Sequence, residues 1–163
     1  MVLILGIDPG LAVTGWGVIR SEGNSLNYVA SGVIKTLAEE NIVHRLKYIF
    51  EQIDQLVVKY APDRAAIEET FVNVNAKSSL KLGQVRGAIM VGIAKHGVDI
   101  AEYAPNLVKK SIVGFGKADK NQMIHMVKVL LPGTIIKIAD EADAVAIAIC
   151  DANHRRISGR VIK

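Results

Sequence analysis

MVLILGIDPG (residues 1–10) opens the chain with an aspartate in a position that needs a reason. Residues 1–7 form an apolar run, which is typical of a strand that is buried on both faces of a sheet. Asp8 ends this run and is followed directly by the turn-forming pair Pro9-Gly10. Because a buried carboxylate is costly unless it is paired, we expect Asp8 either to cap this turn or to have a function.

The segments that follow predict a mixed α/β sheet. Short turns that contain glycine and asparagine separate the first three apolar segments, which indicates an antiparallel meander. Strand patterns then alternate with the 3.6-residue period of amphipathic helices. The expected strands are residues 3–8, 14–20, 26–34, 64–68 and 99–103, and the expected helices are residues 42–60 and 76–96, with further helices that begin near residue 105, after residue 119 and at residue 140.

The connection between the third and fourth strands determines where a second carboxylate lies. A strand–helix–strand unit normally makes a right-handed crossover, which places residues 64–68 parallel to the first strand and beside it. Asp8 and Glu68 then lie at the carboxyl ends of neighbouring strands, where open α/β sheets bind their ligands. Taken alone, Glu68 could be an ordinary charged residue at a strand end.

Asp140 and Asp143, within ADEADAVAIA (residues 139–148), form the third group of carboxylates. Residues three apart share a face of a helix, so both can project from its first turn. Acidic residues there also cap free N–H groups and complement the helix dipole, which is the structural interpretation. Four carboxylates at one edge would repel one another unless a cation bound them. Such ligands suit Mg²⁺ or Mn²⁺, and two such ions about 4 Å apart commonly promote attack at phosphorus.

Composition restricts the classes of protein to consider. With 163 residues, 50% of them hydrophobic, the chain suits one domain with a substantial core. Its formal net charge of +4 favours a polyanionic partner. No apolar stretch approaches the roughly 18 residues of a membrane helix, so we expect no membrane association. The single cysteine, Cys150, and the lack of a signal-peptide pattern at the start lead us to expect a cytoplasmic protein.

Six segments of the chain together resemble the RuvC family of Holliday-junction resolvases. They are GIDPG, TGWGVI, AIEETF, LKLGQVRG, EYAPNLVKKSIVGFGKADK and ADEADAVAIAI. The resemblance implies an RNase H-like α/β fold, a five-stranded mixed sheet flanked by helices, in a single nuclease domain (residues 1–156) followed by a short basic tail (residues 157–163). It also implies a homodimeric endonuclease that resolves four-way DNA junctions in homologous recombination and DNA repair by paired symmetric nicks that leave 5′-phosphate ends.

The resemblance further implies how the site is built. The metal-binding quartet becomes Asp8, Glu68, Asp140 and Asp143, the same four carboxylates that the predicted topology brings together. Some relatives have histidine at the position of Asp140. The implied cofactor is Mg²⁺, with two ions per active site and Mn²⁺ as a substitute. The family also suggests the RuvA–RuvB branch-migration complex as a partner.

Basic residues and one phenylalanine are the predicted DNA contacts. Lys109 and Lys120 match family lysines near the active site, and we expect Lys120 to be catalytic by balancing charge in the transition state. Each could instead be a solvated surface lysine. Phe71 enters a polar loop, and the matching family position implies stacking on an unpaired base, whereas core burial is the common alternative. Further candidates for phosphate contacts are Lys77, Lys81, Arg86, Lys110 and Lys117.

The predicted long helix offers more apolar surface than one face of a sheet needs. Part of this surface suits a dimer interface, where glycines would let a second backbone approach closely, and burial within one domain is the alternative. The residues concerned are Leu80, Leu82, Val85, Ile89, Met90 and Ile93, with Gly83, Gly87 and Gly92.

The main alternative function is that of an RNase H-related nuclease of the YqgF type that acts on RNA. The LKLGQVRG and ADEAD segments argue against it. An actin-type ATPase would need two lobes, for which 163 residues leave no room. A junction-binding module without chemistry would not need the intact set of carboxylates.

Overall fold

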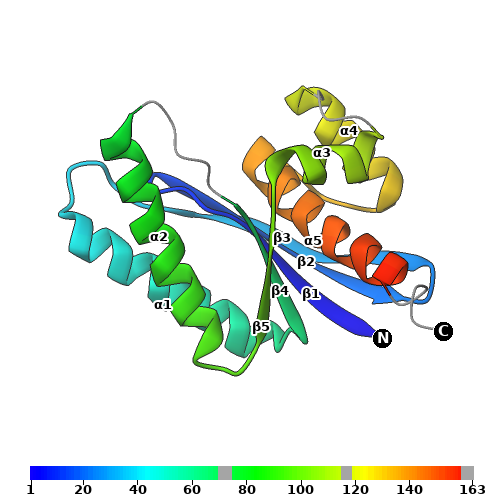
Figure 1. Cartoon of the computed structure of the whole chain (residues 1–163), viewed down its shortest axis with the longest axis horizontal. Helices are drawn as coiled ribbons and strands as arrows, with labels where there is room; N and C mark the ends of the chain where they lie inside the picture. Colours follow the sequence, from blue (N-terminus) through cyan, green and yellow to red (C-terminus); the bar gives the residue numbers. More distant parts are fainter. Residues whose placement is uncertain (70–74, 115–118, 159–163) are drawn as a thin grey trace.

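The computed structural model describes residues 1–69, 75–114 and 119–158, with only the backbone for residues 156–158. Within these residues, the strands form one five-stranded sheet in the order β3-β2-β1-β4-β5, with helices on both faces (Figure 1). The strands are β1 (Val2–Asp8), β2 (Val13–Glu22), β3 (Ser25–Lys35), β4 (Arg64–Glu68) and β5 (Asp99–Tyr103). The helices are α1 (Ile42–Tyr60), α2 (Ala76–Ala94), α3 (Pro105–Val113), α4 (Lys120–Leu130) and α5 (Ala139–Ser158).

The central strand β1 determines where ligands can bind. It pairs antiparallel with β2 and parallel with β4, because the crossover through α1 returns the chain to the far side of β1. The predicted place of residues 64–68, parallel to the first strand and beside it, is therefore confirmed. The mixed five-stranded α/β sheet flanked by helices is confirmed as well.

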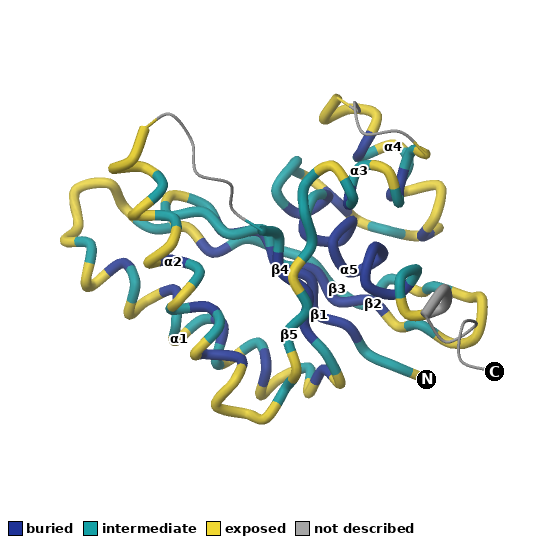
Figure 2. Tube along the Cα trace, in the orientation of Figure 1, coloured by how far each residue is buried: buried dark blue, intermediate teal, exposed yellow. Residues whose placement is uncertain are grey.

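The two faces of the sheet bury separate hydrophobic cores. Successive side chains of a strand point to opposite faces, so Ile4 and Ala66 pack with α3, α4 and α5, whereas Leu5 and Ala65 pack with α1 and α2. Figure 2 shows buried segments along the central strands and along α5. This double burial explains why β1 is apolar at almost every position.

Helix α5 lies close to the sheet because a glycine of β1 faces it. A Cβ atom at Gly6 would lie only 2.1 Å from the carbonyl oxygen of Ala144. A side chain of any size at this position would therefore push the helix outward. Although α5 is rich in alanine and isoleucine, neither it nor any other helix in the described part of the chain is long and apolar enough to cross a lipid bilayer.

The residues predicted for a dimer interface divide between two environments. Val85, Ile89 and Ile93 are fully buried against the sheet and α1, so these three belong to the core of the domain itself. Leu80 lies on the opposite side of α2 and is 66% exposed; Val91, which was not part of the prediction, lies on that side too and is 60% exposed. For the three buried residues the alternative, burial within one domain, is therefore the one confirmed. Apolar spacing on a helix does not tell which side faces the domain's own core.

The last helix extends beyond the expected domain boundary. Helix α5 continues to Ser158, so the boundary placed after residue 156 falls within its final turn. Residues 159–163, the remainder of the predicted basic tail, lie outside the described residues. The division into one nuclease domain and a tail stays a prediction.

Candidate active site

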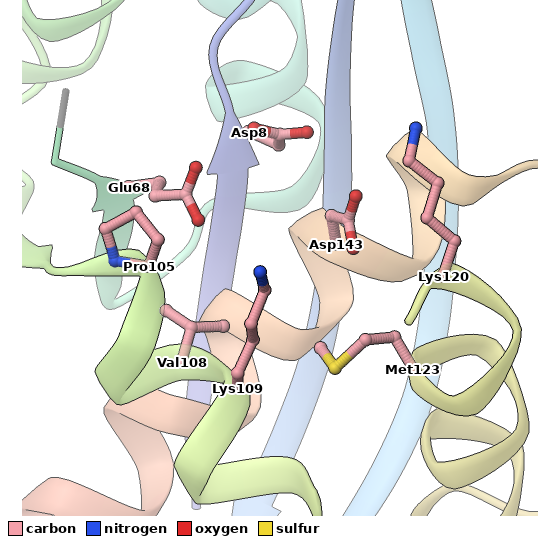
Figure 3. A pocket seen from close by; sticks show the side chains of 8 residues that line it. All are labelled: Asp8, Glu68, Pro105, Val108, Lys109, Lys120, Met123 and Asp143. Carbon is pink, nitrogen blue, oxygen red and sulfur yellow. The ribbon is translucent and has the colours of Figure 1, made fainter. Parts of the chain in front are cut away.

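Asp8 and Glu68 lie side by side at the carboxyl ends of β1 and β4. The two strands are parallel and Ile7 is paired with Ile67, so the next residue of each strand is one of these carboxylates. Figure 3 shows that the two side chains face a common pocket. The structure thus brings together the first two members of the predicted quartet.

Helix α5 adds Asp140 from its first turn and Asp143 from the turn that follows; Asp143 lines the pocket, whereas Asp140 does not. Gly15 of β2, which is paired with Asp8, allows the first turn to approach the sheet. A Cβ atom at Gly15 would lie 2.1 Å from the carbonyl oxygen of Asp140. The helix start is therefore placed over the end of β1 by the lack of a side chain at one position.

Glu141, between these two aspartates, has a different function in the fold. Its carboxylate accepts hydrogen bonds from the Ser31 hydroxyl at 3.3 Å and from the backbone N–H of Lys137 at 3.1 Å. The residue is only 9% exposed and does not line the pocket. It ties the start of α5 to β3, a contact that the acidic pattern of the sequence does not reveal.

The carboxylates of Asp8, Glu68 and Asp143 line an open pocket of about 230 Å³. Lys109 enters it from α3 and Lys120 from α4 (Figure 3). The other lining residues were not predicted from the sequence, because residues of these types on helices usually indicate packing alone. They are Pro105, Val108 and Met123.

Burial and the repulsion between carboxylates both raise pKa values in the pocket. Burial raises the pKa of the Asp8 carboxyl to about 8. Repulsion by neighbouring carboxylates adds to this rise; in decreasing order of effect they are Glu68, Asp143 and Asp140. The ammonium group of Lys120 has the opposite effect and lowers the pKa of Asp8. The pocket therefore contains more negative charge than its lysines compensate.

The pKa values of the other two lining carboxylates are raised as well, in both cases mainly by burial. Burial raises the pKa of Glu68, the charge of Asp143 adds to the rise, and Lys109 opposes it. Burial also raises the pKa of Asp143, with Asp140 adding to the rise, although both pocket lysines oppose it. The two lysines thus act on different but overlapping sets of carboxylates.

The chemistry of these side chains fits a hard divalent cation. Asp8, Glu68 and Asp143 offer only carboxylate oxygens, which Mg²⁺ and Mn²⁺ prefer. A bound dication would favour the ionised form that burial and repulsion disfavour. Within residues 1–69, 75–114 and 119–158, no three acidic, histidine or cysteine side chains already converge in the geometry of a metal site. The residues that would hold an ion are these three, with Asp140 beside them.

The predicted DNA-contacting residues lie in different places. Lys109 and Lys120 line the pocket. Phe71 and Lys117 lie outside the described residues. Exposed positions on helices, outside the lining of the pocket, are taken by Lys77, Lys81 and Lys110.

Arg86 has an environment that its sequence position does not indicate. It forms an ion pair with Glu102 of β5, and its side chain is only 17% exposed. Its Nε atom is buried and has no hydrogen-bond partner among the described residues. The guanidinium therefore links α2 to β5, and this contact competes with the predicted contact to a phosphate.

The fold and the pocket together define a class of protein. Carboxylates at the ends of two adjacent parallel strands and at the start of the last helix, on a mixed five-stranded sheet, are the arrangement expected of an RNase H-like nuclease. The chain belongs to the RuvC family: the family model described as "Crossover junction endodeoxyribonuclease RuvC" matches residues 4–151. This membership does not favour the RNA-directed YqgF alternative.

Known proteins and structures extend this result. The crossover junction endodeoxyribonuclease RuvC of Rickettsia bellii (strain RML369-C) is 52% identical over 148 residues, which cover 90% of this chain and 94% of that protein. Thermus thermophilus RuvC, solved in complex with Holliday junction substrate, is 29% identical with a TM-score of 0.90, over 97% of each chain. The yeast mitochondrial Holliday junction resolvase Ydc2 is 13% identical with a TM-score of 0.69, over 98% of this chain and 84% of that one, and shares the fold.

Proposed function

We propose that this chain resolves four-way (Holliday) DNA junctions in homologous recombination and DNA repair, by metal-dependent paired nicks that leave 5′-phosphate ends. The observation that carries this proposal is the pocket itself, where carboxylates from β1, β4 and α5 meet one lysine from α3 and one from α4. The similarity to a RuvC structure that contains Holliday junction substrate supports the choice of DNA.

The carboxylates of the pocket would hold the metal. Asp8, Glu68, Asp140 and Asp143 would bind Mg²⁺, two ions per site, and Mn²⁺ would substitute for it. Bound ions of this kind activate water for attack and stabilise the leaving oxygen of a phosphodiester. The chain supplies the ligands on rigid elements, two strand ends and one helix start, which keep their separation constant.

The two lysines of the pocket would act on the phosphate. Lys109 and Lys120 line the same cavity as the carboxylates, so a phosphate that enters it comes within reach of both ammonium groups. They draw the anion into a negatively charged site and orient it. Lys120 is the catalytic residue of the pair, because it also opposes the pKa rise of Asp8 and can stabilise the charge that develops on the phosphate.

Phe71 would hold the opened junction by stacking on an unpaired base, while Lys77, Lys81, Lys110 and Lys117 contact phosphates. Stacking is worth roughly 1–3 kcal/mol per base. Phe71→Ala should therefore slow junction cleavage about tenfold or more with little change in Tm, whereas Phe71→Tyr and Phe71→Trp should keep activity. A parallel loss of Tm, binding and cleavage in Phe71→Ala would make this residue part of the core instead.

Paired nicks require two pockets, which a homodimer would supply through the exposed side of α2. Besides exposed Leu80 and Val91, this side contains Gly83 and Gly87, where an added Cβ atom would meet nothing within 4 Å. Leu80→Glu should shift the protein toward a monomer in analytical ultracentrifugation. The enzyme would work in the cytoplasm, with the RuvA–RuvB complex as its partner.

One gel assay tests the proposed function. End-labelled four-way junction, linear duplex and RNA–DNA hybrid are each incubated with the chain in Mg²⁺ or in EDTA. We expect symmetric nicks in the junction alone, and none in EDTA. Preferred cleavage of the hybrid would instead indicate an RNA-directed nuclease, and junction binding without any cleavage would indicate a binding module.

A further inference from the structure

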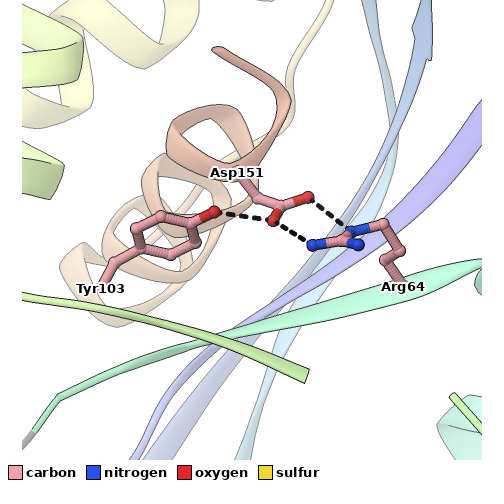
Figure 4. A network of polar contacts seen from close by, with 3 residues as sticks. All are labelled: Arg64, Tyr103 and Asp151. Atoms are coloured by element: carbon pink, nitrogen blue, oxygen red, sulfur yellow. Dashed lines mark hydrogen bonds and ion pairs between the residues drawn. The ribbon is translucent and has the colours of Figure 1, made fainter. Parts of the chain in front are cut away.

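A further acidic residue of α5 is buried in a polar network away from the pocket. The side chain of Asp151 is 0% exposed. Its carboxylate accepts two hydrogen bonds from the guanidinium of Arg64, at 3.2 and 3.3 Å, and one from the hydroxyl of Tyr103 at 2.8 Å (Figure 4). Burial raises the pKa of Tyr103, and its hydrogen bond to Asp151 adds to the rise, so the phenol remains a proton donor. Neither the metal site nor the DNA contacts use this network.

The partners of Asp151 belong to the strands that lead to the pocket. Arg64 is the first residue of β4, whose last residue is Glu68. Tyr103 is the last residue of β5 and is paired with Glu68 in the parallel register. Its carbonyl oxygen also accepts a hydrogen bond from the N–H of Glu69 at 2.9 Å. The network therefore contacts β4 at its first residue, Arg64, and also contacts β5 at Tyr103, the residue paired with Glu68 at the end of β4.

The same carboxylate is connected to the other elements of the pocket. Asp151 lies on α5 about two helical turns after Asp143. Helix α3, which carries Lys109, begins at Pro105, two residues after the end of β5 at Tyr103. Asp151 thus bonds directly to the strand that carries Glu68 and to the strand that leads into α3.

Hydrogen bonds can fix the position of a helix on a sheet more closely than apolar contacts do. The remaining contacts of α5 with the sheet are made largely by alanine, valine and isoleucine, whose packing has no preferred direction. A carboxylate that binds a guanidinium through both oxygens constrains distance and angle together. Replacing a buried ion pair by well-packed apolar residues of the same volume is often neutral or even stabilising. Its contribution here is therefore better explained by geometry than by stability.

We propose that Asp151 is a positioning residue: through Arg64 and Tyr103 it sets where α5 lies relative to β4 and β5, and hence the spacing of Asp143 and Glu68. This inference rests on the proposed function of the pocket as a metal site. The network does not touch the reacting atoms and acts only through the elements it joins.

Metal binding without DNA provides the direct test. Mn²⁺ binding is measured by isothermal titration calorimetry for the wild type, Asp151→Asn and the milder variant Tyr103→Phe. Outer partners of metal ligands typically affect affinity tenfold or more, so this more distant network should weaken Mn²⁺ binding by about three- to tenfold. The Mg²⁺ concentration for half-maximal cleavage should rise by a similar factor, while junction binding in EDTA stays unchanged.

A double variant separates positioning from stability. Asp151→Leu combined with Arg64→Met replaces the ion pair by apolar side chains and should restore Tm, yet Mn²⁺ affinity should remain low. Recovery of Mn²⁺ affinity together with Tm would overturn the proposal.

Asp143→Asn, measured alongside, reports on the pocket itself. If this variant loses Mn²⁺ binding while Asp151→Asn binds normally, only the positioning role is wrong. If Asp143→Asn binds Mn²⁺ as tightly as the wild type, the pocket is not the metal site, and both proposals fall.

Discussion

Two aspartates of the same helix, Asp143 and Asp151, have opposite surroundings. Asp143 faces an open pocket that contains two other carboxylates, and burial raises its pKa. Asp151 is fully buried, but a guanidinium and a phenol compensate its charge. The difference teaches that the partners of a carboxylate indicate its role better than its burial does. Uncompensated carboxylates at a strand edge indicate a cation site, whereas a compensated one joins parts of the fold.

The largest expected effect comes from removing a charge from the pocket. Asp143→Asn should reduce cleavage on the order of a thousandfold or more, because a metal ligand is lost, and Asp8→Asn and Glu68→Gln should behave alike. Junction binding should persist, since less negative charge opposes the phosphate. Without metal, Tm should stay level or rise. Near-normal cleavage by any one variant would remove that residue from the site.

The corresponding change in the Asp151 network, Asp151→Asn, should mainly lower the stability of the fold. Asp151→Asn leaves the partly buried guanidinium of Arg64 without its ionic partner. We expect a loss of about 2 kcal/mol, or roughly 4–8 °C in Tm for a domain of this size. Thermal unfolding of both variants in EDTA gives the comparison directly. A lower Tm for Asp143→Asn than for Asp151→Asn would reverse the assignment of the two residues.

Moving the start of α5 without changing any charge should reduce the cleavage rate less than Asp143→Asn does. Gly15→Ala places a methyl group against the carbonyl oxygen of Asp140 and should displace the first turn. Because a shift of about 1 Å at a reacting group can cost a hundredfold in rate, we expect cleavage to fall by about that factor. Cleavage rates at saturating Mg²⁺ measure this effect. An unchanged rate would mean that the turn adjusts without moving its aspartates.

The pH dependence of stability should report on the raised pKa of Asp8 in the pocket. Asp8 has a pKa of about 8 in the folded chain against 3.8 for the free side chain, so between these values the folded state holds a proton that the unfolded state has lost. Its contribution to stability is complete below about pH 4 and is lost as pH rises to about 8. In EDTA, the decline of Tm with pH should therefore be shallower for Asp8→Asn than for wild type.

One further sample checks that result. Saturating Mg²⁺ should remove much of the decline in the wild type, since a bound cation favours the ionised carboxylates. Identical slopes for wild type and Asp8→Asn would show that Asp8 does not carry the raised pKa.

The smallest expected effect is on the salt dependence of junction binding, where a lysine of the pocket is compared with an arginine that is already in an ion pair. Lys109 lines the pocket, whereas Arg86 is paired with Glu102. Lys109→Ala should lower the slope of log affinity for the junction against log salt by about one phosphate contact. Arg86→Ala should leave this slope unchanged and reduce Tm instead. A change of slope in Arg86→Ala would show that the arginine leaves its ion pair to bind DNA.

The amino-acid sequence by itself determined the strands, the helices and the meeting of Asp8 with Glu68. These features follow from short-range periodicity and from the right-handed crossover, which depend on few long-range details. The predicted place of the fourth strand beside the first was confirmed for this reason. Residue type and spacing also brought the start of the last helix into the predicted site.

Only the tertiary structure decided what each acidic residue of α5 does. Asp151 follows Asp140 by about three helical turns and therefore shares its side of the helix, so spacing alone treats the two alike. The place of Asp151 directly after the apolar run of residues 144–150 is the signal in the sequence that it has buried partners. Those partners, Arg64 and Tyr103, come from distant strands. Which charges meet depends on how the elements pack, and helical periodicity contains no information about the neighbours of a helix.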